Sequence, residues 1–107
     1  MTAPFVSQLR ARGDVLQLAA AGSHAITVRV EMPELWDTVR ASVTPSSAVA
    51  TLKAAALDAL FPGEAADAFV MKLRGFEVLD ENESLTQVGA VDGSIFLLTY
   101  RRRRPVR

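Results

Sequence analysis

The sequence predicts an α+β fold in which one helix packs across one face of a mixed sheet of four to five strands. Two observations carry this prediction. Segments with the two-residue alternation of half-buried strands lie on both sides of residues 48–61, where apolar residues recur with the period of a helix. A pair of strands, a crossing helix and a return to the sheet is the order of a two-layer domain. The chain has 107 residues, enough for one such domain.

Alternation predicts the first two strands. In residues 25–32 polar side chains alternate with apolar ones, which are Ile26, Val28, Val30 and Met32. In residues 38–43 the apolar positions are Val39, Ala41 and Val43. Between these segments lies PELWD, in which Pro33 and Asp37 are turn formers. We therefore expect an antiparallel hairpin whose tip carries Leu35 and Trp36.

A helix of about 13–15 residues is predicted next, ending at the Pro62–Gly63 pair. Hydroxyl oxygens accept hydrogen bonds from the free amides of a first helical turn, so three residues are candidate caps: Thr44, Ser46 and Ser47. The expected apolar stripe consists of Val49, Leu52, Ala56, Ala59 and Leu60. The expected polar, solvent-facing side consists of Thr51, Lys53 and Asp58.

Further strands follow the helix. Residues 69–73 predict a third strand with Phe69, Met71 and Leu73 on one face, and Gly75 ends it. Residues 77–79 predict a short fourth strand before an acidic turn and a loop. Residues 95–100 are almost continuously apolar, which is typical of a central strand covered on both faces.

The predicted domain spans residues 24–101, between an N-terminal extension and a basic tail. Residues 1–23 lack a clean period, so we interpret them as a partly ordered or disordered extension. A short strand containing Val15, Leu16 and Leu18 is the alternative. The formal net charge is zero, but residues 1–100 hold seven basic and 12 acidic side chains, a net charge of −5. The body is therefore acidic and the tail, residues 102–107, is basic.

The composition argues against an enzyme, a metal protein or a cofactor protein. There is no cysteine, and His24 is the single histidine. Asp80, Asn82 and Ser84 have the alternate spacing of a calcium loop, but Leu85 and Val91 replace its turn glycine and closing glutamate. We expect no catalytic, metal-binding or cofactor-binding residues. No convincing secretory signal or apolar span is found, so a cytoplasmic location is expected.

The order of elements over residues 25–101 resembles ubiquitin and the β-grasp superfamily. VTPSSAVATLKAA is similar to the family's passage from strand to helix, and LFPG is similar to its helix exit. VLDENESLTQVGAVDGSIFLLTYR is similar to its acidic turn, long loop and last strand. The resemblance implies a β-grasp fold. It also implies that three residues of the loop are buried anchors, namely Leu85, Val88 and Ala90.

One departure from the family bears on function. Conjugating and sulfur-carrying members end in two glycines, because their activating enzymes need a bare, extended terminus. No glycine follows Gly93 in this sequence, so we expect neither conjugation nor sulfur transfer. In size and tail the chain resembles the bacterial YukD/EsaB type, linked to type VII secretion, and the small subunits of multicomponent monooxygenases. Both act through protein contacts.

The resemblance thus implies a non-catalytic protein-binding module, with another protein as partner. Candidate contact residues are Leu35 and Trp36 at the hairpin tip, Lys72, Arg74 and Phe76 near the third strand, and Arg101, Arg102, Arg103 and Arg104. Trp36 folding over the sheet edge or the extension is the alternative. An open edge strand allows a homo-oligomer. The arginines suit nucleic acid or an anionic membrane less well, because the acidic body opposes both and only Tyr100 precedes them for stacking.

Overall fold

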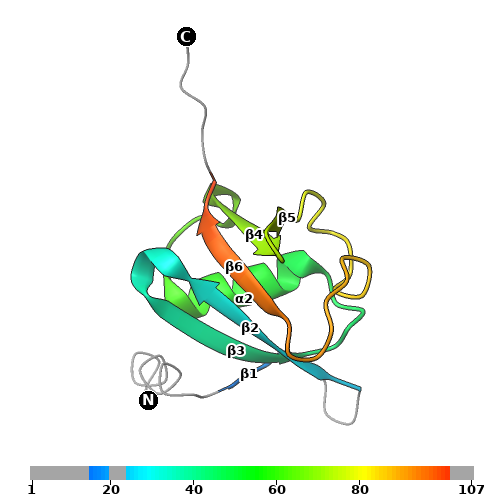
Figure 1. Cartoon of the computed structure of the whole chain (residues 1–107). Coiled ribbons are helices and arrows are strands. Elements are labelled where there is room, and N and C mark those ends of the chain that lie inside the picture. Colours follow the sequence, from blue (N-terminus) through cyan, green and yellow to red (C-terminus); the bar gives the residue numbers. More distant parts are fainter. Residues whose placement is uncertain (1–14, 20–23, 102–107) are drawn as a thin grey trace.

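The computed structural model describes residues 15–19 and 24–101 and has two layers, a six-stranded mixed sheet and a helix across one face (Figure 1). The strands are β1 (Val15–Gln17), β2 (Ile26–Met32), β3 (Asp37–Val43), β4 (Phe69–Leu73), β5 (Phe76–Glu77) and β6 (Ile95–Tyr100). Their order is β1-β3-β2-β6-β4-β5. The helix is α2 (Val49–Leu60), and two 3-10 turns, η1 (Pro33–Leu35) and η2 (Ala66–Ala68), lie between elements. The predicted fold class is confirmed.

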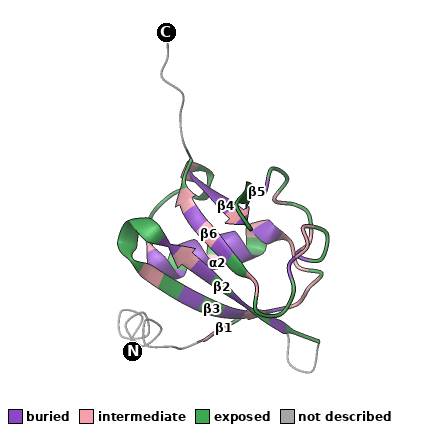
Figure 2. Ribbon diagram, viewed as in Figure 1, coloured by how far each residue is buried: buried purple, intermediate pink, exposed green. Residues whose placement is uncertain are grey.

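The alternation of the hairpin decides which face of the sheet meets the helix. β2 and β3 pair antiparallel along their whole length, from Ile26 opposite Val43 to Met32 opposite Asp37. Every apolar position predicted to point inward is buried in one cluster with the helix (Figure 2). The other face of the sheet, called the outer face below, carries the polar side chains of both strands.

β6 is the central strand, as predicted. It pairs parallel with β2 and antiparallel with β4. Phe96 and Leu98 are fully buried, but Leu97 is only half-buried and Ile95 is exposed. Coverage of both faces is therefore a wrong expectation, since α2 covers the inner face only and no second layer of described residues lies on the outer face.

Residues 15–17 form a short strand, β1, as in the alternative considered for the N-terminal extension. β1 pairs parallel with β3, with Leu16 opposite Ala41. The backbone amides of Leu18 and Ala19 both donate to the carbonyl of Ser42, at 2.8 and 3.0 Å. Leu16 and Leu18 pack against the core. The extension thus adds one strand to the predicted four to five and covers the edge of β3.

The helix begins at Val49, two residues after Ser47, but none of the predicted hydroxyl caps is used. Ala48 occupies the cap position and makes no side-chain hydrogen bond. Instead the backbone amide of Val49 donates to the carbonyl of Glu83 at 2.9 Å, and that of Ala50 donates to the carbonyl of Glu81 at 2.8 Å. The first turn of α2 is therefore capped by the backbone of a loop some 30 residues further along the chain.

The same loop corrects the prediction for Lys53. Its side chain is only 2% exposed, although its position was assigned to the solvent side of the helix. The Lys53 Nζ donates to both carboxylate oxygens of Glu81, each at 3.0 Å. The loop after β5 lies over this part of the helix, so the ammonium group is buried together with its counter-charge.

The loop from residue 80 to residue 91 is itself held by the core. Leu85 and Ala90 are buried and Val88 packs against the core, as the family resemblance implies. The amide of Leu85 donates to the carbonyl of Ser47 at 2.9 Å, and that of Thr86 donates to the carbonyl of Pro45 at 3.0 Å. The loop and the helix start therefore form one unit.

Removing one partner of the Lys53–Glu81 pair tests how much the contact between loop and helix contributes to stability. Glu81→Gln leaves the buried ammonium without its carboxylate, so we expect the free energy of unfolding to fall by about 2–4 kcal/mol in urea denaturation. The double variant Lys53→Met/Glu81→Gln removes the unpaired charge and is expected to recover most of that loss. Glu83→Gln is the matched control, since that side chain makes no hydrogen bond or ion pair among the described residues. A Glu81→Gln protein as stable as the control would contradict the assignment.

Candidate protein-binding surface

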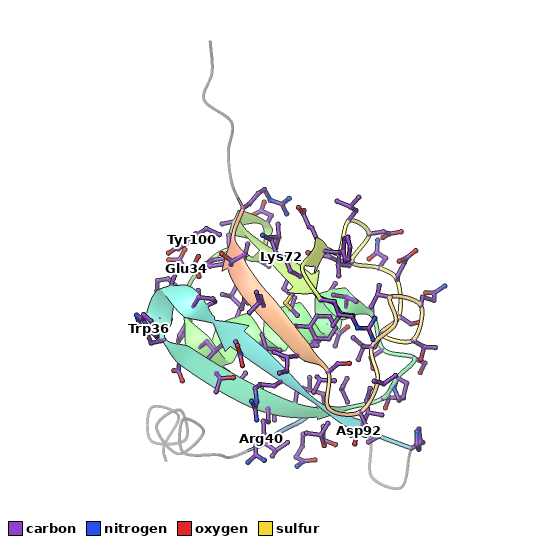
Figure 3. All side chains as sticks on the ribbon, in the orientation of Figure 1. Glu34, Trp36, Arg40, Lys72, Asp92 and Tyr100 are labelled. Atoms are coloured by element: carbon purple, nitrogen blue, oxygen red, sulfur yellow. The ribbon has the colours of Figure 1, made fainter. Side chains whose placement is uncertain are left out.

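The hairpin tip, residues 33–37, presents its tryptophan to solvent. η1 turns the chain, and the backbone amide of Trp36 donates to the carbonyl of Pro33 at 3.1 Å. The Trp36 side chain is 96% exposed and points away from the sheet (Figure 3), and Leu35 beside it is exposed too. The alternative in which Trp36 folds over the sheet edge is therefore not the arrangement found.

The backbone of Trp36 is in the left-handed region, with φ 54° and ψ 39°. That conformation costs a residue with a side chain about 1–2 kcal/mol, and glycine or asparagine adopts it more readily. Because so little of the ring is buried, packing returns almost none of this free energy. Folding thus gives no reason for tryptophan at this position.

Glu34 ties the tip to the end of β6. Its Oε2 accepts a hydrogen bond from the Thr99 hydroxyl at 2.6 Å and a longer one from the Tyr100 amide at 3.4 Å (Figure 3). Partial burial alone would raise the pKa of this carboxyl. The hydrogen bonds from Thr99 and from the backbone amides of Glu34 and Tyr100 outweigh that effect and hold the pKa below its usual value of 4.5. The carboxylate form therefore fixes the tip against the sheet.

The outer face continues from the tip across the sheet. Residues directly opposite one another share a face, so the register defines one row across five strands: Thr38, Glu31, Leu97, Lys72 and Glu77. A second row contains Arg40, Arg29 and Ile95. A hollow of about 280 Å³ joins Trp36 to Glu31 and Thr38. Tip and outer face thus form one surface with an apolar centre, Leu97 and Ile95, among charged side chains.

The three candidate residues near the third strand do not share one surface. Lys72 lies on the outer face, opposite Leu97 and Glu77. Arg74 and Gly75, with φ 54° and 84°, form the two-residue turn between β4 and β5, and the Arg74 Nη2 donates to the carbonyl of Gly89 at 3.0 Å. Phe76 is opposite buried Leu73, so it belongs to the inner side of the sheet edge. The positive φ at Arg74 and Gly75 turns the chain and separates these side chains.

Arg101 serves the end of the domain. Its side chain donates to the carbonyls of Asp67 and Phe69 at 2.9 and 3.4 Å, and it lies 4.0 Å from the Glu77 carboxylate. Its backbone amide donates to Ala68. These contacts close β6 against η2 and β4. Arg102, Arg103 and Arg104 lie outside the described residues.

Sequence reasoning missed Ile95, Leu97 and Leu79. The first two belong to a strand interpreted as covered on both faces. Residues 95–98 are all apolar, so the sequence does not separate Ile95 and Leu97 from buried Phe96 and Leu98; only the burial pattern of β6 does. Leu79 is exposed just after β5, in a segment predicted to be strand. The predicted strand 77–79 is wrong at both ends: β5 begins one residue earlier, at Phe76, directly after the tight turn, and ends two residues earlier, at Glu77.

The acidic turn at residues 80–83 is closed by a hydrogen bond to one of its own carboxylates. The Asp80 Oδ1 accepts a hydrogen bond from the Asn82 amide at 3.0 Å, a local turn that uses the carboxylate. Within residues 15–19 and 24–101 no group of three or more His, Cys, Asp or Glu side chains is placed to hold a metal ion. No helix in the same ranges is long and apolar enough to cross a membrane.

Comparison with known proteins identifies the fold. No protein-family model and no curated protein matches the chain. Among solved structures it is similar to the ubiquitin-like domain of an Arabidopsis thaliana protein, with TM-score 0.63 and 17% identity over 83% of this chain and 90% of that one. It is similar to Caldiarchaeum subterraneum ubiquitin, with TM-score 0.64 and 16% identity over 75% and 98%. The ubiquitin-like domain of Plasmodium falciparum Dsk2 gives TM-score 0.63 and 22% identity over 73% and 100%. The predicted ubiquitin-like fold is thereby confirmed.

The Glu34 contact predicts a pH dependence of stability. Because the pKa of Glu34 is lower in the folded than in the unfolded protein, its contribution is present above pH 4.5 and is lost as the pH falls through the folded value. We expect the difference in unfolding free energy between the native sequence and Glu34→Gln to shrink from about pH 7 to about pH 3 in urea denaturation. A difference that does not change with pH would show that the carboxylate is not held in this way.

The strained position predicts that Trp36 is dispensable for folding. Asparagine tolerates the left-handed region, so Trp36→Asn is expected to leave the free energy of unfolding unchanged or to raise it by up to about 1 kcal/mol. Urea denaturation measures this, with Leu85→Ala as the reference for a buried side chain, where a loss of about 2–5 kcal/mol is expected. A loss of that size in Trp36→Asn would mean that the ring packs on the domain.

Proposed function

We propose that this ubiquitin-like domain binds another protein through the surface formed by the hairpin tip and the outer face. The observation that carries the proposal is Trp36, an exposed aromatic ring on a strained backbone position that folding does not require. Tryptophan is among the residues that most often dominate protein interfaces, because one side chain buries a large area.

The geometry of the tip supports a role in binding. Its backbone is held by the Pro33–Trp36 hydrogen bond, the Glu34–Thr99 bond and a bond from the Thr38 hydroxyl to the carbonyl of Val30 at 3.1 Å. A side chain presented by a rigid turn loses little conformational entropy on association. The ring is therefore prepared for contact.

The composition of the outer face suits a protein better than a small molecule. Leu97 and Ile95 lie at its centre, and Arg29, Glu31 and Lys72 surround them. An apolar centre with a charged rim is the usual arrangement of a protein interface. The hollow beside Trp36, about 280 Å³, is below the range of about 300–1,000 Å³ typical of small-molecule pockets. The module is accordingly proposed to act without catalysis.

The pathway is the open part of the proposal. An accessory of a bacterial secretion system and a small subunit of a multicomponent enzyme such as a monooxygenase both rest on the sequence resemblance, and no residue of this surface favours either. Binding of nucleic acid through the arginine run, and the expected lack of conjugation, concern residues 101–107, of which only Arg101 is described. These stay predictions.

Capture and remeasurement test the proposal. The intact chain is used to isolate partners from its own cells, and each captured protein is purified and titrated calorimetrically with the chain and its variants. We expect Trp36→Asn to weaken binding about 30-fold, as for the loss of an interface hot spot. Lys72→Glu, which reverses a charge beside Leu97, is expected to weaken it as well.

Val91→Ser is the matched control, since it also removes an exposed apolar side chain but lies in the loop before β6, and it lines no part of the hollow beside Trp36. It should change the affinity less than about twofold. The proposal would be contradicted if every captured partner bound Trp36→Asn and the native sequence equally. Light scattering of the native chain and of Trp36→Asn, each without a partner, measures their oligomeric states. A native oligomer that Trp36→Asn dissociates would mean that the partner is a second copy of this chain.

A further inference from the structure

A second hollow lies at the β5 edge of the sheet, away from the tip. It measures about 370 Å³ and lies between the β4–β5 turn and the loop that follows β5. Its apolar lining consists of Leu73, Phe76, Val78, Leu79 and Val88. Its charged lining consists of Arg74, Glu77, Asp80 and Glu83. We call it the edge hollow.

Two apolar side chains of the edge hollow are largely exposed to solvent. Phe76 is 78% exposed and Leu79 is 87% exposed, whereas Leu73 and Val78 beneath them are buried in the core. Exposed apolar groups around a concave, partly apolar floor are typical of a surface that a partner covers. Phe76 shares the face of Leu73 and Lys72 does not, so the edge hollow meets the outer face only at Glu77, the last residue of the outer-face row.

The charge around the edge hollow is acidic. Glu83 makes no side-chain hydrogen bond or ion pair among the described residues, and one oxygen of Asp80 accepts the Asn82 amide. Glu77 is 4.0 Å from Arg101, which offsets part of its charge. Arg74 adds one positive charge at the turn, where its guanidinium donates to Gly89. The two arginines therefore offset charge near Glu77 and at the turn. The carboxylates of Asp80 and Glu83 leave their side of the hollow negatively charged.

The acidic side of the hollow is rigid. The carbonyls of Glu81 and Glu83 cap α2, and the Glu83 amide donates to the carbonyl of Asp80 at 3.1 Å. The buried Lys53–Glu81 pair holds the middle of the same turn. A partner that docks here meets carboxylates and an apolar floor already in position, which lowers the entropic cost of binding.

We propose that the edge hollow is a docking site for a basic segment of a partner protein in which adjacent apolar side chains are flanked by lysine or arginine. The apolar side chains cover Phe76 and Leu79, and the flanking cations face Glu83 and Asp80. A second copy using the same surface is disfavoured, because a symmetric contact would place these carboxylates against one another. The site shares no residue with the hollow beside Trp36 and only Glu77 with the outer face, so it can be tested independently of the proposed function.

Peptides of defined sequence test this site on the intact chain. The probe is Ac-KRKLLKRK-amide, with Ac-EDELLEDE-amide as its acidic counterpart and Ac-KRKSSKRK-amide as its apolar-free counterpart. Titration of the ¹⁵N-labelled chain reports both affinity and location. We expect the probe to shift the amides of residues 76–83 and 88, and to bind more tightly than either counterpart, with affinity that falls as salt is added.

Variants separate the two contributions. Leu79→Ser is expected to weaken binding of the probe about tenfold through the lost apolar contact, and Glu83→Gln about threefold through the lost charge. Neither should affect folding, since Leu79 is exposed and it is the backbone of Glu83 that caps the helix. Asp80 is left unchanged because its carboxylate builds the turn. Trp36→Asn, matched to Leu79→Ser at the other surface, should bind the probe like the native sequence.

Three results would overturn the proposal. One is equal binding of the basic and acidic peptides. Another is amide shifts confined to the tip and outer face, with Leu79→Ser without effect. The third is self-association of the chain that Leu79→Ser abolishes, which would assign the hollow to a second copy.

Discussion

The structure depends on the capping of α2 by a loop that is remote in sequence. The first amides of the helix have no partner within it, and the preceding hydroxyl side chains do not supply one. The carbonyls of Glu81 and Glu83 do so, and the same turn brings the Glu81 carboxylate to the buried ammonium of Lys53. Helix and loop are therefore joined by one set of contacts. This one contact region also sets the positions of Asp80 and Glu83 at the edge hollow.

At the other end of the sheet a different constraint operates. A four-residue connection, residues 33–36, closes the β2–β3 hairpin, and it places Trp36 in the left-handed region. Glu34 then holds this turn to the end of β6 through Thr99. The domain thus has two rigid ends, one at the tip and one at the turn after β5. Each presents apolar side chains that packing does not use, and we infer that each is available to a separate partner.

Local pattern predicted the fold better than it predicted the surfaces. Alternation in β2 and β3 and the helical stripe of α2 each depend on neighbours along the chain, and these were correct. Helical spacing predicts a solvent-facing Lys53, because this spacing contains no information on the loop after β5 that covers this side of the helix. Arg74 and Phe76 were grouped with Lys72 because the turn that separates them arises from two consecutive positive φ angles. Trp36 was recognised as a candidate from its place at the tip, whereas its exposure and its strained backbone required the structure.

The sequence by itself determined the α+β class, the ubiquitin-like order of elements, the buried faces of the hairpin and helix, and the absence of cysteine chemistry. It determined these because burial of apolar side chains at periods of two and 3.6 residues is a local property of the chain. Tertiary structure alone decided the addition of β1 to the edge of β3, the remote cap of α2, the burial of Lys53 and the division of the candidate residues between two surfaces. Those features depend on which distant segments meet, and that outcome follows from the packing of the whole domain.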